Sequence, residues 1–110
     1  MNDKELAGAV VALGVVTDKG SHYEFPNEAF VLSDELLVRD WRVAGPLMQR
    51  WLSKLHESDT DMRRHFIGID EMGLNYCCCT HRVCRDASWV ANESLPRAII
   101  EACVEAIGGH

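Results

Sequence analysis

The chain has 110 residues, of which 47% are hydrophobic and 25% charged, and a formal net charge of −6 at pH 7, which together are typical of one soluble globular domain. The acidic balance argues against direct nucleic-acid binding, which needs clustered Lys and Arg. The best apolar run, residues 6–16, is too short to span a bilayer, and the start of the chain lacks the basic region of a secretory signal, so we expect a cytoplasmic protein that does not bind membranes.

The first quarter of the chain is expected to form a helix and a short strand. Asn2 or Asp3 can cap a helix over residues 4–13, and Gly14 is well placed to end it. A turn at residues 18–20 then leads to a strand over residues 22–25, which Pro26 stops. Residues 27–39 contain apolar pieces without a clean period, so no element is assigned to them.

The middle of the chain is expected to contain a second helix. Proline removes a hydrogen bond from a helix interior, so this helix begins either at Pro46, after Gly45, or near Asp40 with a kink. Asp40 is a cap candidate, and Trp41 is expected to anchor in the core or in a groove. The acidic residues 57–61 that follow are expected to form a solvated linker.

The last part of the chain predicts a hairpin and a third helix. The strands cover residues 66–69 and 74–80, with a turn at 70–73, and residues 84–92 are expected to be a variable loop anchored by Trp89. Ser94 can cap a helix over residues 95–107. The order α-β-α-β-β-α predicts an α+β domain over residues 1–110, with a small antiparallel sheet sandwiched by helices. The predicted core comprises Leu6, Val10, Leu47, Trp51, Leu55, Ile99, Cys103 and Val104.

Four of the five cysteines lie in the stretch YCCCTHRVC, residues 76–84. In a strand, Cys77, Cys79 and His81 would share one face and form half of a metal site, but adjacent positions on one face are about 6.5–7 Å apart, and no second ligand pair follows. A catalytic cysteine needs a positioned base, which no pattern here supplies. We therefore favour cysteines that act as small apolar residues, with a metal or redox site at Cys77, Cys79, His81 and Cys84 as the alternative.

Three segments carry a resemblance to a known family. They are ELAGAVVALGV at residues 5–15, DWRVAGPLMQRW at residues 40–51 and LPRAIIEACVEAI at residues 95–107. Together they resemble the ABA-sandwich family of small phage and prophage proteins, in which an Asp-Trp-x-x-x-Gly-Pro helix start lies in mid-chain. The resemblance implies the fold, a bacterial host cell and a role as a viral accessory factor, and it supplies no catalytic residue and no cofactor.

The sequence favours binding over catalysis. It contains no Ser/His/Asp set, no paired carboxylates and no Gly-rich phosphate loop, so we do not expect an enzyme or a cofactor. The expected partner is a host or phage protein complex, and inhibition of a host defence system is one form that such binding takes. The candidate partner-binding residues are the acids of the linker and the turn, with Trp89 as an apolar alternative: Glu57, Asp59, Asp61, Asp70 and Glu71.

Overall fold

The first helix, α1 (Asp3–Ala12), begins and ends where its sequence places the capping residues. In this computed structural model, which describes residues 1–53, 63–69, 73, 75–82 and 88–108, Asn2 is the N-cap and its side chain accepts a hydrogen bond of 2.8 Å from the Glu5 backbone. The Glu5 carboxylate accepts from the Asn2 backbone N–H in return, which completes a capping box. Gly14 follows the helix with φ at 79°, a left-handed conformation that glycine adopts without steric cost.

Three short strands follow α1 and form an antiparallel meander: β1 (Thr17–Asp18), β2 (Tyr23–Glu24) and β3 (Phe30–Val31). The strand expected at residues 22–25 corresponds to β2. The unassigned segment 27–39 contains β3 and a short helix, α2 (Asp34–Leu37), whose N-cap side chain is that of Ser33. Hydrophobic periodicity gave no signal here because each element is only two to four residues long.

The next helix, α3 (Trp41–Ser53), begins after Asp40 and continues through Pro46. Asp40 accepts a hydrogen bond of 2.8 Å from the Arg42 backbone N–H, so the structure confirms it as a cap. Of the two predicted starts, the one near Asp40 is therefore correct. Trp41 is 55% exposed, so the expectation that it anchors in the core is wrong: it lies in the first turn, on the solvent side.

The second sheet consists of β4 (Arg63–Ile69), β5 (Tyr76–Arg82) and β6 (Ser88–Asn92), with β5 in the centre. The predicted hairpin is present, with Ile69 paired to Tyr76 and Phe66 to Cys79. The expected loop over residues 84–92 is wrong for its last five residues, which pair with β5 on its other side. Val90 explains this outcome: as part of β6 it is buried, 7% exposed, in the core.

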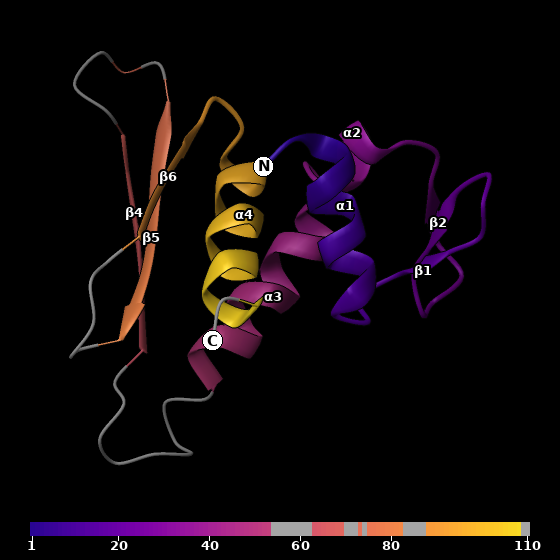
Figure 1. The fold of residues 1–110 in the computed structure, drawn as a ribbon, viewed down its shortest axis with the longest axis horizontal. Helices are drawn as coiled ribbons and strands as arrows, with labels where there is room; N and C mark the ends of the chain where they lie inside the picture. Colours follow the sequence, from indigo (N-terminus) through magenta and orange to yellow (C-terminus); the bar gives the residue numbers. More distant parts are fainter. Residues whose placement is uncertain (54–62, 70–72, 74, 83–87, 109–110) are drawn as a thin grey trace.

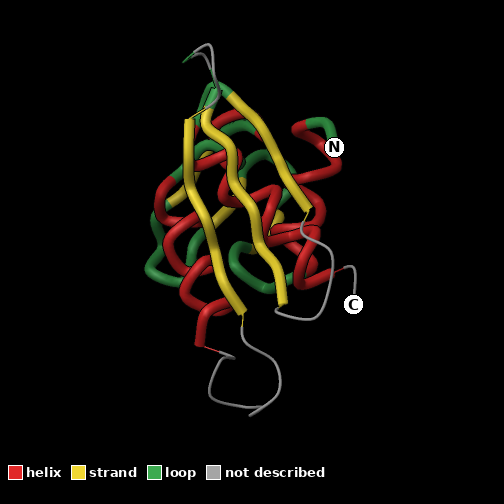
Figure 2. Tube along the Cα trace, turned by 90° about the vertical axis from the view of Figure 1, so that its left-hand side faces the viewer, coloured by secondary structure: helices red, strands yellow, loops and turns green. Residues whose placement is uncertain are grey.

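The last helix, α4 (Leu95–Gly108), packs along this sheet and against α3. Figure 1 shows the sheet edge-on at one side, then α4 and α3, then α1 and α2, and finally the meander, and Figure 2 shows the same sheet in front of the helices. The structure is thus an α+β fold with helices and an antiparallel sheet, as predicted, but the prediction that helices sandwich this sheet does not describe its packing. All of the helices that the structure describes lie on the same face of this sheet.

The core lies between the helices and the sheet, and it confirms the predicted buried residues wherever their side chains are described. They are no more than 5% exposed: Leu6, Val10, Leu47, Ile99, Cys103 and Val104. The side chains of Trp51 and Leu55 lie outside the described residues. Within the described part of the chain, no helix has the length and apolar character needed to cross a membrane.

Candidate functional site

The β1–β3 meander contains a pocket on the side of the molecule away from the large sheet. Its first wall is the turn between β1 and β2, where the Lys19 backbone N–H donates to the His22 carbonyl over 2.9 Å. Gly20 has φ at 89°, and its N–H donates to Asp18 Oδ1 over 2.8 Å, so the turn holds the Asp18 carboxylate in place. The second wall is the segment that leads from β3 into α2 and carries Leu32, Ser33 and Asp34.

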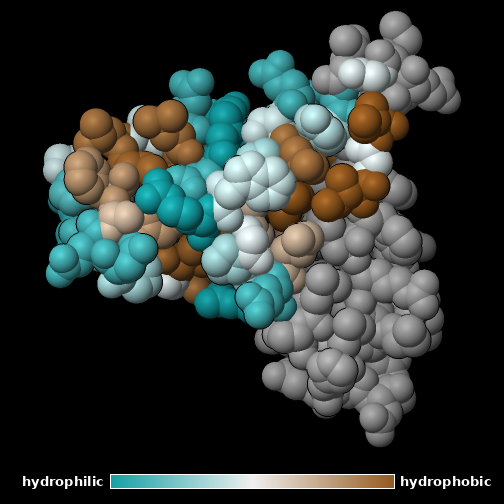
Figure 3. All heavy atoms as spheres, turned by 180° about the vertical axis from the view of Figure 1, so that it is seen from behind, coloured by the Kyte–Doolittle hydropathy of each residue, from teal (hydrophilic) through white to brown (hydrophobic). Residues whose placement is uncertain are grey.

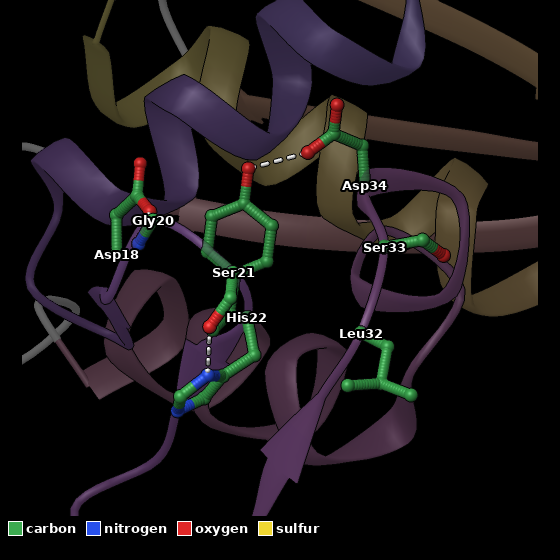
Figure 4. A pocket seen from close by; sticks show the side chains of 8 residues that line it. Asp18, Gly20, Ser21, His22, Leu32, Ser33 and Asp34 are labelled. Carbon is green, nitrogen blue, oxygen red and sulfur yellow. Dashed lines mark hydrogen bonds between the residues drawn. The ribbon is translucent and has the colours of Figure 1, made fainter.

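The pocket has a volume of about 290 Å³ and is lined mainly by polar groups. Figure 4 shows the two walls, with Asp18 and Gly20 on one and Leu32, Ser33 and Asp34 on the other. Tyr23 donates a hydrogen bond to Asp34 Oδ1, and Ser21 Oγ is bonded to His22 Nδ1 over 2.9 Å. The lining residues are Asp18, Gly20, Ser21, His22, Tyr23, Leu32, Ser33 and Asp34.

The electrostatics of this pocket are negative. The hydrogen bond to Asp34, burial and the nearby charges of Asp34 and Asp18 raise the pKa of Tyr23 to about 12, so the tyrosine is a neutral donor at physiological pH. Residues 17–38 contain five acids and one lysine, a net charge of −4 with histidine neutral. Of the eight lining residues, none is a lysine or an arginine.

Large apolar side chains are exposed on β3, on α2 and on the segment between them, which forms the second wall of the pocket. Phe30 is 59% exposed, Leu32 67% and Leu36 57%, although all three lie within seven residues of one another. The Phe30 ring also meets the His22 ring edge-on, with 5.6 Å between centroids. We call Phe30, Leu32 and Leu36 the apolar rim. Figure 3, which views the molecule from behind, shows that hydrophobic atoms reach the surface among hydrophilic ones at several places on that face. Single exposed apolar residues are common on monomers, whereas contiguous exposed apolar patches are typical of interaction sites.

A second charged cluster joins α1 to α4, and it is structural. Arg97, only 6% exposed, donates to Asp3 Oδ1 and to Glu101 Oε2, each over 2.9 Å, and to the Met1 carbonyl over 2.7 Å. Burial alone would raise the pKa of Asp3, but hydrogen bonds from Arg39 and Arg97 outweigh it and hold that pKa below 3.8. Because each charge already has an opposite partner, this cluster stabilises helix packing and offers no open position to a ligand.

The residues that the sequence singled out are mostly outside the described part of the chain. This applies to the linker acids Glu57, Asp59 and Asp61 and to the turn acids Asp70 and Glu71, as well as to Cys84. The prediction that they bind a partner therefore stays a prediction.

The remaining predicted residues are placed by their backbone alone. Cys77, Cys79 and His81 occupy alternate positions of β5, as the half-site hypothesis requires, and Trp89 lies in β6 opposite Cys79. The structure describes only the backbone of these four residues, so nothing follows about the contacts of their side chains. Among the described residues, no group of three or more His, Cys, Asp or Glu side chains is arranged to hold a metal ion.

Sequence reasoning missed the meander pocket and its apolar rim. The available signal was local: Asp18-Lys19-Gly20 indicates a turn, and Ser33-Asp34 is a helix start in the middle of an unassigned segment. Comparison of the chain with protein-family models, curated proteins and solved structures found no match. Any function for this chain must therefore be inferred from its own geometry.

Proposed function

We propose that this chain is a non-enzymatic accessory protein, of the kind that phages and prophages encode, and that it acts by binding another protein. The observation that carries the proposal is the apolar rim: Phe30, Leu32 and Leu36 each expose more than half of their surface within one short segment. Water contact with these side chains is unfavourable, so a partner that covers them contributes binding free energy roughly in proportion to the apolar area removed from water.

Charge indicates which kind of partner fits this surface. The rim belongs to segment 17–38, whose net charge is −4, within a chain whose net charge is −6. A basic protein surface with apolar side chains complements it, whereas an acidic surface or a nucleic-acid backbone is repelled. Blocking a basic site on a host defence complex is one activity that such a surface supports.

The rim is also separate from the residues that hold the fold together. Val31, between Phe30 and Leu32, and Leu37, next to Leu36, are core side chains that are 8% and 0% exposed, whereas the rim residues are more than half exposed. Replacing rim residues should therefore change binding without unfolding the protein.

The test uses two exposed apolar residues of matched size and exposure. Leu32 in the rim is 67% exposed, and Ile69 at the end of β4 is 66% exposed. Proteins captured from a bacterial lysate by the wild-type chain are identified, purified and titrated against Leu32→Ser and Ile69→Ser by calorimetry. We expect Leu32→Ser to weaken affinity about tenfold or more and Ile69→Ser to leave it unchanged.

Equal affinity of both variants for every captured protein would contradict the proposal.

The acidic linker is a second predicted contact and is tested in the same assay. Reversal of Glu57, Asp59 and Asp61 to Lys should slow association and reduce its dependence on salt. If affinity and salt dependence both stay unchanged, the linker is not part of the interface.

A further inference from the structure

We infer that the meander pocket receives the guanidinium group of an arginine side chain from the protein partner. This inference rests on the proposed function, because the apolar rim beside the pocket is the surface on which that partner would lie. It adds the chemistry of the group that enters: a planar cation on an apolar stem.

The pocket offers acceptors on both of its walls. Asp18 lies on the wall formed by the β1–β2 turn, and Asp34 lies on the opposite wall at the start of α2 (Figure 4). Each carboxylate uses one oxygen, Oδ1, for a hydrogen bond within the protein, to Gly20 and to Tyr23 respectively. A carboxylate has about four lone-pair sites, so Asp18 and Asp34 can each accept further hydrogen bonds. A ligand that enters the pocket must therefore donate hydrogen bonds to both walls. A guanidinium, with five N–H donors in a fixed plane, meets this requirement.

Volume limits what can enter. Pockets for cofactors and drug-sized ligands span about 300–1,000 Å³, and the volume of this pocket, about 290 Å³, is just below that range. A single long side chain fits this space, whereas a dinucleotide does not. Phosphate and carboxylate ligands are disfavoured because two carboxylates and no lysine or arginine line the pocket.

The apolar groups around the pocket favour arginine over lysine. Leu32 lines the wall on the Asp34 side, and the rings of His22 and Tyr23 also line the pocket. The methylene stem of a long basic side chain packs on apolar surface, and a guanidinium stacks on ring faces and is less strongly hydrated than an ammonium group. The lysine ammonium group is a compact charge, so it stacks less well on the rings than a guanidinium does and is less suited to bonding two separated carboxylates at once.

The first test is an NMR titration of the full chain, labelled with ¹⁵N, with N-acetyl-arginine methylamide. Saturable shifts are expected at the backbone amides of Gly20, Ser21 and Ser33, which border the pocket. N-acetyl-citrulline methylamide has the same shape without the charge and should give at least about tenfold weaker binding. Shifts that do not saturate, or equal affinity for both compounds, would overturn the inference.

Two acidic substitutions and a control locate the site. Asp18→Asn and Asp34→Asn should each weaken arginine binding about tenfold, whereas Glu28→Gln, which removes an exposed acid outside the pocket lining, should not. Asp34→Asn also alters the acceptor of Tyr23, so Asp18→Asn, which leaves that pair intact, decides the result if the Asp34 variant does not fold. Unchanged binding in Asp18→Asn would also overturn the inference.

The failure of this inference is distinguishable from failure of the proposed function. If arginine does not bind the pocket while Leu32→Ser still weakens partner binding, the pocket assignment is wrong and the binding role stands. If Leu32→Ser and Ile69→Ser bind partners equally, the proposed surface is wrong, and with it the source of the arginine.

Discussion

Arg97 and Asp3, 94 positions apart in the sequence, are joined by a hydrogen bond of 2.9 Å from Nε to Oδ1. The same guanidinium bonds Glu101 one turn further along α4, so one buried side chain connects the first and last helices. Asp3 accepts a second bond of 2.9 Å from Arg39, which follows α2. The packing of α1, α2 and α4 thus depends on one carboxylate and two arginines of different burial.

Replacing Arg97 should destabilise the fold far more than replacing Arg39. Arg97→Leu removes one of the two opposite charges beside Glu101, which is 11% exposed and keeps the Met1 ammonium at 3.1 Å, and it also removes a hydrogen bond to Asp3. We expect a loss of about 2–3 kcal/mol in the free energy of unfolding, because several buried charged hydrogen bonds are lost together. Arg39 is 31% exposed, so Arg39→Leu should cost less than about 1 kcal/mol. Urea unfolding followed by circular dichroism measures both. If both variants lose the same free energy of unfolding, the burial of Arg97 does not determine how much this residue contributes to stability.

Stability should fall in acid because of Asp3. Its pKa in the folded protein is held below 3.8, so its contribution is present above the unfolded pKa and is lost as the pH falls through the lower, folded value. Asp3→Asn should therefore be less stable than wild type near neutral pH, and the difference should shrink below about pH 4. Unfolding curves at several pH values check this. Glu93→Gln, which removes an exposed acid, should run parallel to wild type. If the difference in stability between Asp3→Asn and wild type stays constant with pH, the pKa of Asp3 is not lowered by folding and the prediction is wrong.

The core and the apolar rim should respond differently to the same chemical change. Leu47 is fully buried, so Leu47→Ala should reduce the free energy of unfolding by about 2–5 kcal/mol. Leu32→Ala removes the same atoms from a side chain that is 67% exposed and should change stability by less than about 0.5 kcal/mol. Thermal unfolding distinguishes the two. A large loss for Leu32→Ala would mean that the rim supports the fold and is not a free surface.

The cysteines of β5 should act as apolar residues. The purified chain is expected to hold no stoichiometric zinc by elemental analysis and to keep its fold in chelator. Cys77→Ser and Cys79→Ser should lower stability through the burial of polar groups. One zinc per chain, with unfolding on chelation, would instead support the metal alternative at Cys77, Cys79, His81 and Cys84.

Much of this fold could be predicted where a local chemical rule specifies it. Asn2, Asp40 and Ser94 begin helices because their side chains bond the first free backbone N–H groups, and Gly14 follows α1 in a left-handed conformation. The interior stripes of α1 and α4 follow from helical period alone. Such signals do not depend on distant parts of the chain.

The features that were missed depend on tertiary contacts. Strand β6 exists because β5 offers a second edge and Val90 reaches the core, neither of which is visible in its five residues. The pocket needs Asp18 and Asp34 on its opposite sides, and only the folded meander places them so. Strands of two residues are too short for a period-two pattern to stand out.

The meander is attached to the scaffold by few of its residues. Phe25 and Val31 are 6% and 8% exposed and pack in the core, whereas most of the other side chains between Thr17 and Leu36 face solvent or the pocket. The proposed binding surface and the core thus use largely different side chains within one continuous segment. A designer who keeps the residues that pack in the core, the turn glycine and the α2 cap could exchange the exposed positions and redirect the chain to a new target. The residues to keep are Phe25, Val31, Tyr23, Ala29, Gly20 and Ser33.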